Sequence, residues 1–177
     1  MLKVNSIPDI DNEMAKNIVS LANKFVVKLS QVLTNESPHD REVIDYIYFV
    51  NILSRTLHNS QFLMSHKLLP CIIQICKLCT LKLLAISNDE QYFYIWWDYI
   101  KLLMSYSLQI IGNFTNPRHL WLSQQQQPLV DTDLTFYSDS KMFLFNLGLL
   151  KIIQGIFIFL IIILKINYYY NRFIQIL

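Results

Sequence analysis

The chain has 177 residues, of which 53% are hydrophobic, 14% aromatic and only 16% charged. This length allows a domain with its own core, so folding requires neither disulfides nor a metal. The 15 basic and 13 acidic residues are mixed along the chain and give a net charge of +2, a pattern that gives little support to nucleic-acid binding. With 3 glycines and 5 prolines, the chain lacks the turn residues of an all-β fold, and we predict an all-α fold.

The first helix is predicted at about residues 10–33, where apolar residues recur at three- and four-residue steps: Ile18, Leu21, Ala22, Phe25, Leu29 and Val32. Acidic residues at its start suit the helix dipole: Asp9, Asp11 and Glu13. A second helix is predicted from the N-cap Ser37, with Pro38 in its first turn, to about His58. The polar pair Asn59-Ser60 then predicts a break.

A long apolar run from Leu68 to Ile86, with Pro70 in its first turn, predicts a further helix. Asn88 is the predicted N-cap of the next helix, which reaches about Ile111. The segment 112–117 predicts another break, 117–122 one or two further helical turns, and the glutamine run 124–127 a loop.

Two parts of the chain share an order of features that suggests an internal repeat. Each has a helix end with asparagine (Asn51, Asn113), a polar turn, a short helix, a second turn and an apolar helix led by proline (Pro70, Pro128). Over about residues 43–130 this order resembles the armadillo repeat, whose units pack one short and two longer helices. The resemblance implies a short, right-handed, armadillo-like helical stack. A plain helical bundle is the alternative.

The resemblance also implies a function, because stacked helices form an extended concave surface that holds a peptide or another domain. In armadillo proteins asparagines late in the third helix bind the backbone of an extended peptide, which makes Asn51 and Asn113 candidate partner-binding residues; capping of helix ends is their alternative role. Lys67 stands where that family usually has glycine, and the two breaks lie 62 residues apart where roughly 40–47 are expected.

Trp96 and Trp97 are further candidates for partner binding, since tryptophan and tyrosine dominate binding hot spots. Core packing between helices is the alternative for this pair.

The segment from Met142 to Leu164 has Lys151 as its only charge and exceeds the roughly 20 residues that span a bilayer. Tyr168, Arg172 and their neighbours resemble interfacial anchors. Lys151 opposes insertion by about 2.5–3.5 kcal/mol at a helix centre. Three interpretations remain open: a transmembrane helix, a buried last helix of the stack, and a misassigned gene segment, which the Ile-, Leu-, Phe-, Tyr-, Asn- and Lys-rich composition after residue 141 suggests.

The sequence contains no pattern typical of an enzyme or a cofactor site. Cys76 and Cys79 have redox-motif spacing but lie in an apolar helix without a second cysteine pair, so buried small side chains are the expected role. The histidines, at His39, His58, His66 and His119, fall near helix ends without metal-site spacing. Isolated glycines exclude a phosphate-binding loop. We expect no catalytic, cofactor or metal site.

The sequence therefore predicts an armadillo-like helical domain at 1–130, a polar linker at 131–140 and a hydrophobic segment at 141–177. The expected function is a non-catalytic protein-interaction scaffold or adaptor, as a fragment of a larger regulator, with an extended peptide or a small GTPase as its partner. A small tail-anchored membrane protein with a helical cytosolic domain is the alternative. The expected location is the cytoplasm, where the three cysteines would be reduced, with or without membrane attachment through the C-terminal helix.

Overall fold

The computed structural model describes residues 7–35, 38, 40–115 and 138–142. These residues form five helices, and residues 138–142 add one short helical turn. The helices are α1 (Asn12–Val32), α2 (Glu42–Leu53), α3 (Leu57–Ser65), α4 (Leu68–Ile86) and α5 (Glu90–Thr115). The described part of the chain confirms the predicted all-α fold.

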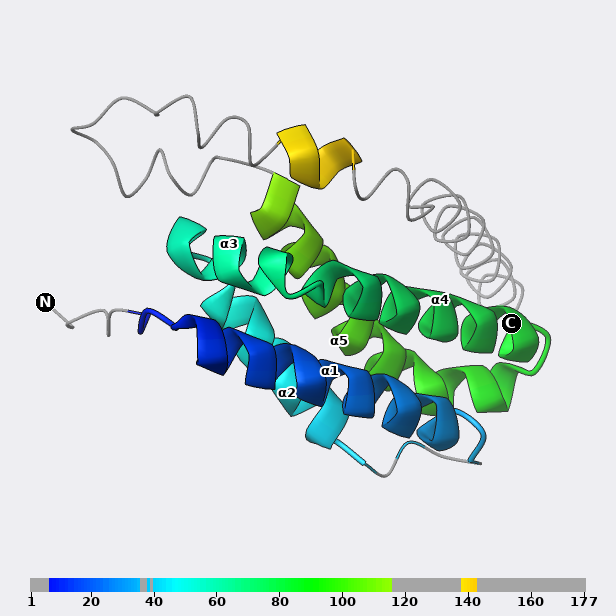
Figure 1. Cartoon of the computed structure of the whole chain (residues 1–177). Helices are drawn as coiled ribbons and strands as arrows, with labels where there is room; N and C mark the ends of the chain where they lie inside the picture. Colours follow the sequence, from blue (N-terminus) through cyan, green and yellow to red (C-terminus); the bar gives the residue numbers. More distant parts are fainter. Residues whose placement is uncertain (1–6, 36–37, 39, 116–137, 143–177) are drawn as a thin grey trace, which may run out of the picture.

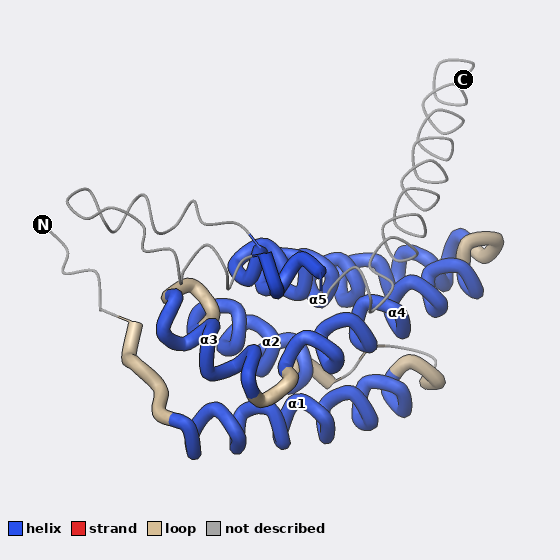
Figure 2. The backbone as a smooth tube through the Cα atoms, turned by 45° about the horizontal axis from the view of Figure 1, so that its top comes forward, coloured by secondary structure: helices blue, strands red, loops and turns tan. Residues whose placement is uncertain are grey.

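Four of the helices form two pairs, α1 with α4 and α2 with α5, and the two helices of each pair point the same way. In Figure 1, α1 and α4 run side by side from left to right, whereas α2 and α5 return from right to left. Contacts along the helices follow the same order: Cys71 of α4 meets Asn23 of α1, and Lys82, eleven residues later, meets Leu33 at the end of α1. Figure 2 shows the short α3 beside the start of α4, where it also packs on α1.

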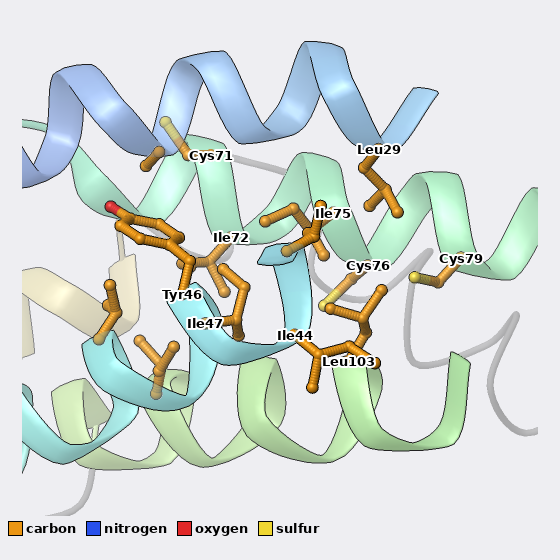
Figure 3. Packing of buried hydrophobic residues seen from close by; sticks show 14 of the residues in the cluster. Leu29, Ile44, Tyr46, Ile47, Cys71, Ile72, Ile75, Cys76, Cys79 and Leu103 are labelled. Carbon is orange, nitrogen blue, oxygen red and sulfur yellow. The ribbon is translucent and has the colours of Figure 1, made fainter. Parts of the chain in front are cut away.

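A single core of buried side chains lies between these helices. Figure 3 shows α4 in its centre, with Ile72, Ile75 and Cys76 between α1, α2 and α5. Ile47 of α2 and Leu103 of α5 are fully buried on the other side of the same cluster. Full burial of one such side chain stabilises a fold by about 1.5–3 kcal/mol, so α4 is the helix on which the packing depends.

The N-terminal half of the fold begins as the sequence predicts. Asp11 caps α1, because its carboxylate accepts a hydrogen bond of 2.7 Å from the backbone N–H of Met14. The apolar face of α1 is buried at Ile18, Ala22, Leu29 and Val32, but Leu21 is 42% exposed, although its spacing predicted a place on the same face. Leu21 therefore belongs to the outer surface of the molecule.

The boundaries around α2 and α3 differ from the prediction. The helix α2 begins at Glu42 rather than after Ser37, which lies outside the described residues, and Asp40 accepts a hydrogen bond of 2.9 Å from the backbone N–H of Glu42. It ends at Leu53, and Thr56 caps a new helix. The predicted break at Asn59 and Ser60 is wrong, because both residues lie within α3.

Asn59 and Ser60 are fully buried, and their side chains bind backbone groups outside α3. Asn59 accepts a bond from the Ile10 N–H at 2.9 Å and donates to the Pro8 and Leu53 carbonyls at 3.0 Å. Ser60 donates to the Ser54 carbonyl at 2.8 Å. These bonds offset the cost of burying polar groups and hold the N-terminal segment and the end of α2 against α3.

The turn between α3 and α4 contains Lys67 at φ 66°, the only non-glycine residue with positive φ among the described residues. This left-handed conformation costs a residue with a Cβ about 1–2 kcal/mol, and glycine adopts it freely. Lys67 thus takes a backbone conformation that favours glycine.

The helix α4 has the predicted bounds, whereas α5 begins and ends elsewhere than predicted. Asp89 rather than Asn88 accepts the capping bond, from the Tyr92 N–H at 3.0 Å. The helix continues to Thr115, through the first four residues of the break that was predicted at 112–117. Two contacts favour this continuation: Phe114 is fully buried, and Asn113 donates hydrogen bonds to Asn51 of α2 and to Ser54 just after it.

Among the described helices, α4 is long and apolar enough to cross a membrane, with 50% of its apolar window buried inside the protein. Core helices pass the same test of length and composition, and α4 lies in the core. The predicted turns at 117–122, the loop at 124–127 and, apart from Met142 itself, the segment Met142–Leu164 lie outside the described residues, as does most of the linker 131–140.

Candidate protein-binding surface

The helices α2 and α5 meet through a cluster of polar side chains. Asn51 donates a hydrogen bond of 2.9 Å to the Gln109 side-chain oxygen. Asn113 donates to the Ser54 hydroxyl at 2.9 Å and lies 3.4 Å from the Asn51 side-chain oxygen. Ser54 in turn donates to the Asn51 carbonyl at 3.0 Å. Asn51 and Asn113, the two predicted partner-binding asparagines, therefore lie together in the structure.

Two residues of this cluster are buried between the helices, and two are more exposed. Asn51 is 1% exposed and Ser54 is fully buried, so both belong to the contact between the helices. Asn113 is half-buried and Gln109 is exposed. Of the two predicted partner-binding asparagines, Asn113 reaches the surface, whereas Asn51 lies beneath it and supports Gln109.

An aromatic pair extends this surface along the same two helices. The rings of Tyr48 on α2 and Tyr106 on α5 are 5.1 Å apart and tilted by 51°. Tyr48 is 46% exposed, and Tyr106 is half-buried. We call Tyr48, Tyr106, Gln109 and Asn113 the α2–α5 surface. Tyrosine rings and amide groups together suit recognition of a peptide, because they offer apolar area and hydrogen bonds to its backbone.

Sequence reasoning found Asn51 and Asn113 but missed the other members of this surface. A signal was present: Tyr48 and Asn51 are three residues apart, and Tyr106, Gln109 and Asn113 follow at steps of three and four. These spacings place side chains on one face of a helix. Nothing in the sequence showed that the two faces meet.

Of the two candidate tryptophans, Trp96 lies in the core and Trp97 at its edge. Trp96 is fully buried, with its ring 5.8 Å from that of Tyr99 and with the Lys82 ammonium 4.3 Å above it. Trp97 is half-buried and stacks on Phe93 at 5.5 Å. In this structure Trp96 belongs to the contact between α4 and α5, and Trp97 is the member of the pair that reaches the surface.

The Lys82 ammonium also donates a hydrogen bond of 2.7 Å to the Leu33 carbonyl at the end of α1. Burial lowers the pKa of Lys82, because the charged form loses hydration. This side chain joins α1, α4 and α5 at one end of the fold.

The three cysteines are free thiols buried in the face of α4 that Figure 3 shows. Burial raises the pKa of all three thiols, that of Cys76 to about 12, although the Ser107 hydroxyl acts in the opposite direction on Cys76. Nucleophilic and redox chemistry require the thiolate, so these cysteines act as small core side chains, as the sequence predicts.

The described histidines make contacts near the ends of helices. A ring nitrogen of His58 lies 3.1 Å from the Ile10 carbonyl, and one of His66 lies 2.7 Å from the Asn12 side chain. Within the described ranges, no group of three or more His, Cys, Asp or Glu side chains could hold a metal. His39 and His119 lie outside those ranges.

No protein-family model and no solved structure matches the chain. The chain is similar to a putative uncharacterized protein of Dictyostelium discoideum, to which it is 27% identical over 118 residues. The match covers 66% of this chain and 8% of that protein, so the chain spans less than a tenth of the length of this curated relative. The similarity assigns neither a family nor an activity.

Proposed function

We propose that this protein is a non-catalytic interaction scaffold, built as a short armadillo-like stack of helical pairs, that binds another protein across the α2–α5 surface. The observation that carries the proposal is the parallel placement of the two pairs, α1 with α4 and α2 with α5. Stacking of like units in register is the principle on which helical-repeat scaffolds are built. The meeting of Asn51 with Asn113 and the conformation of Lys67 support the same interpretation.

The spacing of the two pairs along the chain is uneven. Contacting residues of α1 and α4 are 48 or 49 positions apart, whereas those of α2 and α5 are 58 to 62 apart. The difference reflects the short α2, which has 12 residues where α5 has 26. The unit is thus longer than the roughly 40–47 residues of an armadillo or HEAT repeat.

The partner we favour is an extended peptide, with a folded small GTPase as the other candidate. The exposed amide of Gln109 is held by Asn51 on one side and donates to the Ser105 hydroxyl at 3.3 Å on the other. Side chains held in place lose less entropy on binding, which favours recognition of a backbone. The match covers 8% of the Dictyostelium relative, and on this ground we propose that the domain acts as part of a larger protein.

Quantitative affinity purification with the full chain tests this proposal. The double variant Tyr48→Ala/Tyr106→Ala should reduce recovery of specific partners at least about tenfold, as expected for the loss of two aromatic contacts of about 1 kcal/mol or more each. Tyr94→Ala is the matched control, because Tyr94 is also on α5 and is 56% exposed but lies outside the α2–α5 surface. Equal recovery with both variants would rule out this surface as the binding site.

We propose attachment to a membrane through Met142–Leu164 as the second candidate property, supported by the length and apolar composition of that segment. Extraction with alkaline carbonate distinguishes the two cases. A full-length chain that stays with the membrane is anchored, and one that is released is a soluble or peripheral scaffold.

A further inference from the structure

An open groove of about 430 Å³ is lined by residues of α1, its N-cap Asp11 and α2. Its floor is apolar and contains Met14, Ile18 and Leu21 of α1 with Tyr46 and Phe49 of α2. Met14 is 48%, Leu21 42% and Phe49 49% exposed. Three large apolar side chains gathered at one groove are a feature that marks interaction surfaces.

The groove follows one stripe of α1. Seven residues make nearly two turns of a helix, so Met14, Leu21 and Lys28 lie in one line, and Asn17 and Lys24 lie in a line beside it. Val27 is 59% exposed but lies about 120° around the helix from Leu21. Val27 is therefore an exposed apolar residue of the same helix that does not face the groove, and it can serve as a control for Leu21.

The ends of this stripe carry opposite charges. Asp11 and Glu13 line the groove at the start of α1, and Lys24 lies one turn beyond Leu21. Further along, the Lys28 ammonium is paired with Asp40 at 2.6 Å and with Glu42. Glu13 and Lys24 are therefore the acidic and basic groups that flank the apolar centre.

This order of charges is complementary to itself when reversed. The midpoints of the pairs Met14/Leu21 and Glu13/Lys24 both fall between residues 17 and 19. A two-fold axis at this point would turn α1 of a second copy antiparallel to the first. It would bring Met14 of one copy to Leu21 of the other, and Glu13 of each copy to Lys24 of its mate.

We propose that this groove binds a second copy of the same chain, so that the protein forms a two-fold dimer through antiparallel α1 helices. The apolar floor supplies the buried area, and the two Glu13–Lys24 pairs fix the direction of the helices. Phe49 borders this interface, whereas its neighbour Tyr48 belongs to the α2–α5 surface, so dimer formation leaves that surface accessible.

Sedimentation equilibrium of the full chain tests the dimer by charge exchange. Glu13→Lys and Lys24→Glu each place like charges together at two symmetric positions and should raise the dissociation constant about tenfold or more. The double variant Glu13→Lys/Lys24→Glu recreates the attraction with reversed signs and should restore the dissociation constant to within about threefold.

A second pair of variants distinguishes association through the groove from nonspecific hydrophobic association. Leu21→Asp should abolish the dimer, whereas Val27→Asp should leave it unchanged, because the two residues lie on different sides of the same helix. Circular dichroism of each variant checks that the helices remain folded. The proposal is overturned if the chain is monomeric, if its association is insensitive to these substitutions, or if the double charge variant fails to recover.

Discussion

The contacts of α5 with its two neighbours use different chemistry. Toward α4 the contact is mainly apolar, with Leu103 beside Cys76 and the buried Trp96 beneath Lys82. Toward α2 it is polar and aromatic, with Asn51, Ser54, Gln109 and Asn113 joined by hydrogen bonds. One helix thus joins an apolar core to a polar surface.

The difference indicates that the apolar contact mainly stabilises the fold, whereas the polar contact mainly positions the helices. Apolar burial is strong but has no direction, so it stabilises α5 against α4 without fixing its exact position along the axis. A hydrogen bond is worth only about 0.5–1.5 kcal/mol net but requires one particular partner. The α2–α5 cluster is therefore suited to setting the register of α5 against α2, and with it the positions of the exposed side chains.

The largest loss of stability is expected from truncation on the apolar side. Leu103→Ala removes a fully buried side chain from between α4 and α5 and should lower the free energy of unfolding by about 2–5 kcal/mol. Denaturant titration followed by tryptophan fluorescence measures the change, since Trp96 lies in the same contact. Leu108→Ala is the control on the same helix, because Leu108 is 38% exposed, and it should cost less than about 0.5 kcal/mol.

A smaller and coupled loss is expected on the polar side. Asn51→Ala and Asn113→Ala each leave partners without their hydrogen bonds and should cost about 1–3 kcal/mol. Because the two side chains share one cluster, the double variant should cost about 0.5–1.5 kcal/mol less than the sum of the single variants. Denaturant titration of the unmodified protein, the two single variants and the double variant gives this coupling as a double-mutant cycle. Additive costs would show that the two asparagines act separately, which breaks the proposed common network.

The two sides of α5 also differ in how far the sequence predicts them. The helix α4 was predicted with its observed bounds, because an unbroken apolar run with Pro70 near its start is a local signal. The ends of α2 and α5 were misplaced because Asn59, Ser60 and Asn113 look like turn residues. Their partners are Pro8, Ile10, Leu53, Ser54 and Asn51, most of them on other elements and up to 62 residues away in sequence.

The candidate site could likewise be predicted only in part from the sequence. The repeat pattern selected Asn51 and Asn113 but not Tyr48, Tyr106 and Gln109, since their importance arises from the meeting of two helix faces. The groove of α1 was missed for a related reason: Leu21 has the spacing of a core residue, and only the placement of α2 and α4 leaves it outside. Local periodicity identifies an apolar face but not which part of it the rest of the chain covers.

The smallest expected effect is a gain at Lys67, which stands outside both contacts of α5. Lys67→Gly relieves the left-handed backbone at the turn into α4 and should raise the free energy of unfolding by about 0.5–1 kcal/mol, after the added entropy of glycine in the unfolded chain. Lys67→Ala is the matched control, because it removes the same side chain but keeps the Cβ and its strain. An equal gain from alanine would assign the effect to the lysine side chain instead.

Combining Lys67→Gly with Leu103→Ala, and separately with Asn51→Ala, then tests how the turn relates to the two sides of α5. Independent sites add to within about 0.3–0.5 kcal/mol. If the turn only relieves backbone strain, both combinations should be additive in denaturant titration. If it instead sets the position of α4 under α5, the gain should shrink with Leu103→Ala and persist with Asn51→Ala, because only the apolar contact then depends on where α4 begins.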